Sequence, residues 1–125
     1  MPSAFIDDGY SETETIPAVN GIHGPHVITF RPITSGEIAR YESRMRVAGE
    51  DELKQRDATS ELLASKLIEW DIMDSTGTPV KIEPKNLLNL RPLFFWKLFE
   101  LCARGLAIPK EPDKKESDLK NSPPG

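Results

Sequence analysis

The chain has 125 residues, 38% of them hydrophobic and 29% charged, which is the composition of one ordinary globular domain. Its net charge of −4 disfavours a general affinity for nucleic acid, because nucleic-acid-binding surfaces are clustered and basic. The single cysteine, Cys102, excludes an internal disulfide, and residues 1–20 lack the basic start and apolar run of a signal peptide. We therefore expect a cytoplasmic protein that is neither secreted nor bound to a membrane.

The composition changes at both ends of the chain. Residues 1–14 are acidic and polar apart from an isolated Phe5-Ile6 pair, and residues 109–125 are rich in charged residues and proline. Such segments bury too little apolar surface to fold alone, so we expect a flexible acidic arm and a disordered polar tail. The residues between them, 15–108, are expected to form a single domain.

Two β-prone runs, Thr13 to Val19 and His26 to Ile33, flank an Asn20-Gly21 pair. Asn-Gly supplies the positive backbone torsions that a tight turn needs, so the two runs predict a β-hairpin. Alternation along the second run places Ile28 and Phe30 on the side that faces the core.

Helix signals follow the hairpin. Thr34 and Glu37 have the spacing of a capping box, in which each side chain accepts a hydrogen bond from the other's backbone N–H, and they predict the start of an amphipathic helix. Acidic residues favour a second helix from about Asp51, whose apolar second half reaches the core and which ends near Asp71. Pro84 then predicts a short helical turn.

The most apolar stretch of the chain runs from Pro92 to Gly105. Proline suits a first helical position and glycine the left-handed residue that closes a helix. The helix is too short for a bilayer, which needs about 20 apolar residues, so it must be covered by the core, by a second copy or by a partner protein. The sharper interpretation is that part of it binds another apolar helix. The candidate partner-binding residues are Phe94, Phe95, Trp96, Leu98 and Phe99.

These elements predict a mainly α fold of the α+β class. It consists of an N-terminal β-hairpin followed by a small bundle of about four helices, with an arm at each end.

Few residues have the spacing of a chemical site. His23 and His26 are only two of the three or four ligands that a metal needs, so a solvated hairpin turn accounts for them better. Asp71 and Asp74 lack the spacing of a calcium loop and are expected to end a helix and shape a turn. Cys102 lies in the apolar helix, where burial suppresses its thiolate. We predict no enzymatic activity, no metal and no cofactor.

The order of features is more distinctive than any single motif. A strand leads into Phe30-Arg31-Pro32-Ile33-Thr34-Ser35-Gly36-Glu37, a polar helix leads to Leu67-Ile68-Glu69-Trp70-Asp71 and Asp74 to Val80, and Asn86-Leu87-Leu88-Asn89-Leu90 precedes the apolar helix. From about Val27 to Gly105 this order resembles the tail assembly chaperones of long-tailed bacteriophages, of the siphovirus and myovirus kinds.

The resemblance implies a small, largely helical protein of the infected cell's cytoplasm that is absent from the finished virion. It implies two partners, the tape measure protein, whose long apolar helix the chaperone coats, and the tail tube subunits recruited to it. It carries over no catalytic residues. A chaperone of this kind must offer apolar surface in many weak contacts that are released later.

Three alternatives belong to other classes. A structural virion protein, such as a head–tail joining or minor tail protein, would use its arms to order on neighbouring subunits. A small nucleic-acid-binding protein would use the basic residues between Lys81 and Arg104, where two helices meet at Pro92 as in a helix-turn-helix. A small helical adaptor protein unrelated to phage is a further alternative. The apolar helix offers few polar side chains to read base edges, which makes nucleic acid the less favoured partner.

Overall fold

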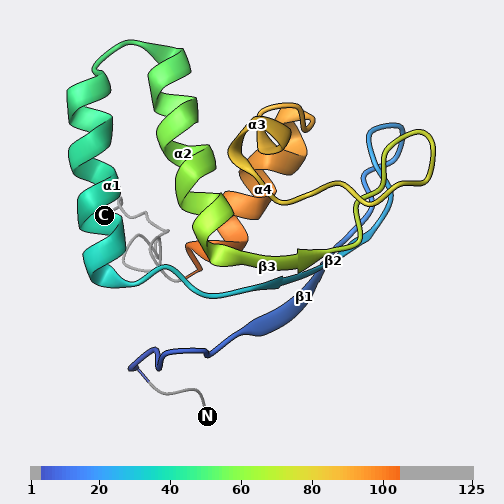
Figure 1. Ribbon diagram of the computed structural model, residues 1–125, viewed down its shortest axis with the longest axis horizontal. Helices are drawn as coiled ribbons and strands as arrows, with labels where there is room; N and C mark the ends of the chain where they lie inside the picture. Colours follow the sequence, from blue (N-terminus) through green and yellow to red (C-terminus); the bar gives the residue numbers. More distant parts are fainter. Residues whose placement is uncertain (1–3, 105–125) are drawn as a thin grey trace, which may run out of the picture.

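The computed structural model describes residues 4–104 and combines a three-stranded antiparallel sheet with four helices (Figure 1). The strands lie in the order β1-β2-β3 and comprise β1 (Glu12–Ile16), β2 (His26–Phe30) and β3 (Leu67–Trp70). The helices are α1 (Ser35–Ala48), α2 (Glu52–Lys66), α3 (Pro84–Leu87) and α4 (Pro92–Cys102). The predicted α+β class, with an N-terminal hairpin and four helices, is confirmed.

The predicted β-hairpin is present in β1 and β2, which pair from Glu12 opposite Phe30 to Ile16 opposite His26. The connection between the strands is longer than a tight turn, and Gly21 within it has the positive φ of 79° that its sequence predicts. Ile28 and Phe30 are fully buried, as their alternation in the sequence predicts.

The N-terminal arm is partly attached to the domain. β1 begins at Glu12, inside the range predicted to be a flexible arm. The Arg31 side chain donates hydrogen bonds to the backbone carbonyls of Asp7 (3.2 Å) and Tyr10 (3.1 Å), which fixes the approach to β1. The predicted polar tail, and Gly105 as the closing residue of α4, lie outside the described residues.

The prediction that the second helix continues to Asp71 is wrong. α2 ends at Lys66, and Leu67–Trp70 form β3, which pairs antiparallel with β2. β-branched and aromatic residues favour strands, and pairing along β2 satisfies backbone groups that would otherwise stay open at a sheet edge. A bulge next to Phe30 lets Leu67 enter the core while Ile68 stays exposed.

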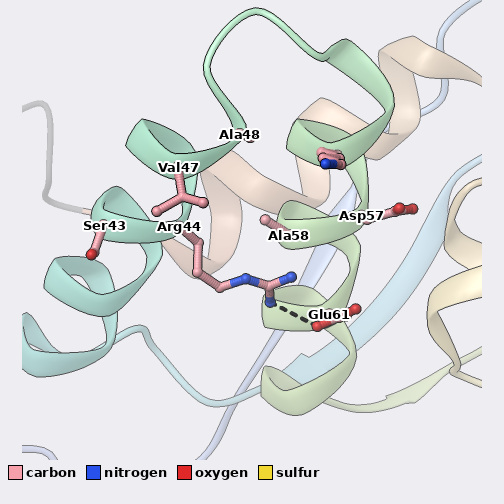
Figure 2. Close-up of a pocket in the computed structure, with 8 residues that line it drawn as sticks. Ser43, Arg44, Val47, Ala48, Asp57, Ala58 and Glu61 are labelled. Carbon is pink, nitrogen blue, oxygen red and sulfur yellow. Dashed lines mark hydrogen bonds and ion pairs between the residues drawn. The ribbon is translucent and has the colours of Figure 1, made fainter.

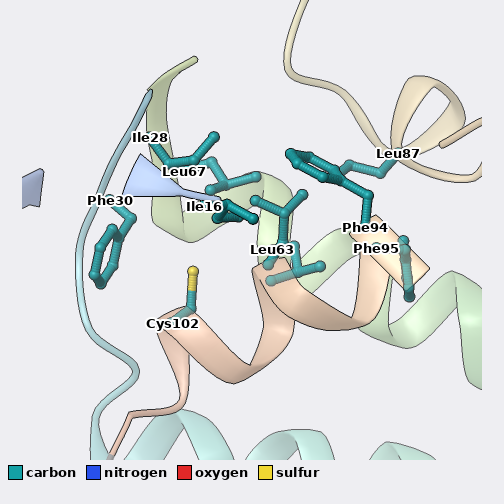
Figure 3. Close-up of a cluster of buried hydrophobic side chains, with 10 residues drawn as sticks. Ile16, Ile28, Phe30, Leu63, Leu67, Leu87, Phe94, Phe95 and Cys102 are labelled. Atoms are coloured by element: carbon teal, nitrogen blue, oxygen red, sulfur yellow. The ribbon is translucent and has the colours of Figure 1, made fainter. Parts of the chain in front are cut away.

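The core lies between the inner face of the sheet and the helices α2, α3 and α4, as Figure 3 shows for its largest side chains. The fully or nearly fully buried apolar residues are Ile16, Ile28, Phe30, Leu63, Leu67, Leu87, Phe94, Phe95, Leu98 and Cys102. α1 contributes no buried residue and packs mainly on α2, so the two form a hairpin that projects from the sheet (Figure 1).

The predicted capping box is present and connects α1 to the end of α2. The Thr34 hydroxyl accepts from the Glu37 backbone N–H at 3.2 Å, and the Glu37 carboxylate accepts from the Thr34 backbone N–H at 2.9 Å. Lys66 Nζ donates a hydrogen bond to each oxygen of the same carboxylate, at 2.8 Å in both cases. The Glu37–Lys66 ion pair therefore joins the start of α1 to the end of α2, where the α1–α2 hairpin meets the sheet.

Candidate partner-binding surface

The five candidate residues of α4 are divided between the core and the surface. Phe94, Phe95 and Leu98 are buried and pack in the core (Figure 3 labels the first two). Trp96 is 38% exposed and Phe99 is half-buried. The predicted contact with a partner is therefore restricted to Trp96 and Phe99, because using the other three would require the core to open.

The exposed side of α4 joins α1 and α2 in an aromatic strip, which we define as Tyr41, Arg56, Trp96 and Phe99. The ring centroids lie 6.1 Å apart between Trp96 and Phe99 and 5.6 Å apart between Phe99 and Tyr41. The Arg56 guanidinium lies 5.2 Å from the Trp96 centroid, within cation–π range. Leu93, 44% exposed, precedes Trp96 by three residues and extends the apolar surface along the helix.

Sequence reasoning missed two members of the aromatic strip. Tyr41 lies on α1, and its hydroxyl lies 2.7 Å from the Thr59 hydroxyl of α2, which holds its ring beside α4. Arg56 was not singled out, since nothing in a sequence shows that a charged residue of α2 covers a tryptophan 40 positions later. Both contacts depend on the packing of α1 and α2 against α4.

A shallow groove of about 300 Å³ lies between α1 and α2 (Figure 2). Val47, on its α1 side, is 86% exposed, and Ala58 lies on the α2 side. Arg44 crosses the groove to Glu61, with 2.7 Å between nitrogen and oxygen. Val47 is therefore the exposed apolar side chain of this groove, because Ala58 is buried and polar residues line most of the rest.

The sequence predicts that His23 and His26 lie in a solvated hairpin turn; His23 does lie in the connection between the strands and His26 begins β2, but both side chains are only partly exposed. Their rings contact the edge of Phe94, with centroids 4.9 and 5.3 Å away. His23 Nδ1 donates to the Gly24 carbonyl at 2.7 Å, and its buried Nε2 has no hydrogen-bond partner among residues 4–104. His26 Nδ1 lies 2.8 Å from Asp71. Both histidines therefore belong to the packing around the start of α4.

The two aspartates behave differently from each other. Asp71 was expected to end a helix, but it follows β3 and accepts from His26 and from the Val27 backbone N–H. Asp74 shapes a turn as predicted, because one of its oxygens accepts from the backbone N–H groups of Thr76 and Thr78. Among residues 4–104, no group of three or more metal-ligating side chains is placed to hold a metal ion.

Cys102 is fully buried in the core. Burial raises the pKa of its thiol to about 12, against a smaller opposing effect of the Lys66 charge. The thiolate is the reactive form of cysteine, so the folded protein holds this sulfur in an unreactive state.

We expect Cys102 to react with a thiol reagent such as DTNB at pH 8 about a thousandfold more slowly in the folded protein than in urea, given its reduced thiolate fraction and its burial. The measurement is the rate of thiol release with and without denaturant. Rapid stoichiometric reaction of the native protein would contradict the buried position.

Comparisons of the chain with protein-family models, with curated proteins and with solved structures found no match. Within the described part of the chain, no helix has both the length and the apolar character needed to cross a bilayer.

Proposed function

We propose that this chain is a phage tail assembly chaperone that coats the apolar helical tape measure protein and helps to recruit tail tube subunits. The observation that carries the proposal is the aromatic strip. Trp96 stays 38% exposed and its ring contacts that of half-buried Phe99, although Phe94, Phe95 and Leu98 of the same helix are buried in the core. Tryptophan, tyrosine and arginine are the residues most enriched where proteins make their strongest contacts.

The strip has the chemistry needed to hold an apolar helix. A partner helix laid along α4 would cover Leu93 and Trp96, which lie on the same side of the helix. Burial of one large apolar side chain is worth about 1.5 to 3 kcal/mol, so one copy binds weakly. Many copies along a long apolar helix bind strongly together and are released individually, which suits transient coating.

The charged first helix supports the same role. α1 exposes Arg40, Arg44 and Arg46 together with Glu42, and it buries none of its side chains. A chaperone that covers an apolar helix must present a polar outer surface to remain dissolved. The projecting α1–α2 hairpin (Figure 1) supplies that surface, and it also contributes Tyr41 and Arg56 to the strip.

Replacing Trp96 with Ala is expected to abolish solubilisation of a co-expressed tape measure protein and to lower its binding at least about tenfold, because the variant loses the largest exposed contact of the strip. The measurement is the soluble fraction of the tape measure protein after co-expression, followed by pull-down. Ile68→Ala is a matched control, because Ile68 is 51% exposed on β3 and lies outside the strip.

Three outcomes would contradict the proposal. If the wild-type chain leaves the tape measure protein insoluble, the chaperone role is wrong. If the chain is found in stoichiometric amounts in purified phage particles, a permanent structural virion protein replaces a transient chaperone. Equal losses for Trp96→Ala and Ile68→Ala would show that the strip is not the binding surface.

A further inference from the structure

A pocket of about 380 Å³ lies beside the start of α4, on a different side of this helix from the aromatic strip. Its apolar lining comes from Ile72, Met73, Val80, Leu90 and Phe94. Ile72, Met73 and Val80 belong to the segment between β3 and α3, and His23, from the connection between β1 and β2, also lines the pocket. The volume is within the range of ligand-sized pockets and accommodates an aromatic side chain.

The polar residues of this pocket are cationic or neutral. The guanidinium of Arg91 is exposed and makes no hydrogen bond or ion pair with any residue between 4 and 104. The Asn89 side chain is likewise free, and Asn86 donates to the Lys81 carbonyl at 2.9 Å, which leaves its own oxygen available. None of the described residues that line the pocket carries a carboxylate, and Asp71, the partner of His26, is not among them.

This charge pattern departs from the rest of the molecule. The chain carries a net charge of −4, yet the pocket combines an apolar floor with one unpaired cation. An arginine fork binds a carboxylate by two parallel hydrogen bonds, which fixes orientation as well as affinity. The matching occupant is an apolar group with a carboxylate next to it.

We propose that this pocket binds a partner protein through a large apolar side chain, such as Phe, while an Asp or Glu of the same segment pairs with Arg91. This is an interaction site separate from the aromatic strip, because Phe94 and Arg91 contribute to the pocket and Trp96 does not. It gives the chain a second, charge-selective contact in addition to the apolar one.

The test uses two blocked, alanine-rich helical peptides that each contain one Phe. One peptide has Glu four residues after the Phe, and the other has Gln. In ¹H–¹⁵N NMR titrations of the full chain, we expect the Glu peptide to shift the amides of Met73, Asn89 and Leu90 saturably. It should bind about tenfold more tightly than the Gln peptide, as expected for one charge-assisted hydrogen-bonded contact.

Arg91→Gln should remove the difference between the two peptides, whereas Arg46→Gln should preserve it. Arg46 is a matched control because it is exposed on α1, outside the pocket, and its replacement changes the net charge equally. A third peptide with Ala in place of Phe should not shift these amides. The proposal is overturned if no peptide binds saturably, if Glu and Gln peptides bind equally, or if Arg46→Gln acts like Arg91→Gln. Each of these failures would leave the Trp96 experiment unaffected.

Discussion

Replacing Glu37 with Gln is expected to lower the free energy of unfolding by about 3 kcal/mol, because it leaves the buried Lys66 ammonium without a carboxylate. Lys66 is only 2% exposed, and both oxygens of Glu37 lie 2.8 Å from its Nζ. The amide oxygen of Gln can still accept one hydrogen bond, but it supplies no compensating charge. The measurement is urea unfolding followed by far-UV circular dichroism.

The reciprocal variant, Lys66→Met, should cost much less, about 1 kcal/mol, because it removes the buried charge itself. Glu37 is then left with 28% of its side chain exposed and keeps its hydrogen bonds to Thr34. The double variant should be more stable than Glu37→Gln alone. Equal losses for the two single variants would show that the pair acts as an exposed salt bridge.

The same pair makes stability depend on pH. Partial burial raises the pKa of Glu37, but hydrogen bonds from Lys66 and Thr34 and the Lys66 charge outweigh it, so the pKa lies below the ordinary value. A carboxyl whose pKa is lower in the folded state stabilises the fold fully above about pH 5, and this stabilisation is lost as the pH falls through the folded pKa. Glu37→Gln should therefore flatten the acid side of the stability profile.

Local signals in the sequence were sufficient to predict the β1–β2 hairpin and the residue at which α1 begins. The Asn20-Gly21 pair and the Thr34–Glu37 capping box each act within a few residues, and the structure contains both. β3 could not be found in the same way. Its residues continue the apolar pattern of α2, and only the open edge of β2, some 40 residues earlier in the chain, makes a strand the better solution.

The candidate surface was predictable only in part. The charged residues Lys97 and Glu100 mark the outer side of α4, which by helical spacing places Phe95 and Leu98 on the opposite, buried side. Trp96 lies beside the charged residues, so its exposure follows from the sequence once that geometry is applied. The contribution of Arg56 does not follow from the sequence, because it depends on how α2 crosses α4.

Leu98→Ala is expected to lower the free energy of unfolding by about 3 kcal/mol, because a fully buried leucine leaves a cavity between the sheet and α2. Trp96→Ala should cost about 1 kcal/mol or less, since it loses partial burial and the cation–π contact with Arg56. Urea unfolding of both variants measures the change in stability. A pull-down of the tape measure protein, performed under conditions in which each variant is folded, measures binding separately.

The two effects should appear in different variants. Folded Leu98→Ala should still bind the tape measure protein, because its outer surface is unchanged, whereas folded Trp96→Ala should not. Such a result would establish that α4 stabilises the fold with one side and binds a partner with the other. If Leu98→Ala left stability unchanged, the assignment of Leu98 to the core would be wrong, and the apolar side of α4 would have to be covered by another molecule.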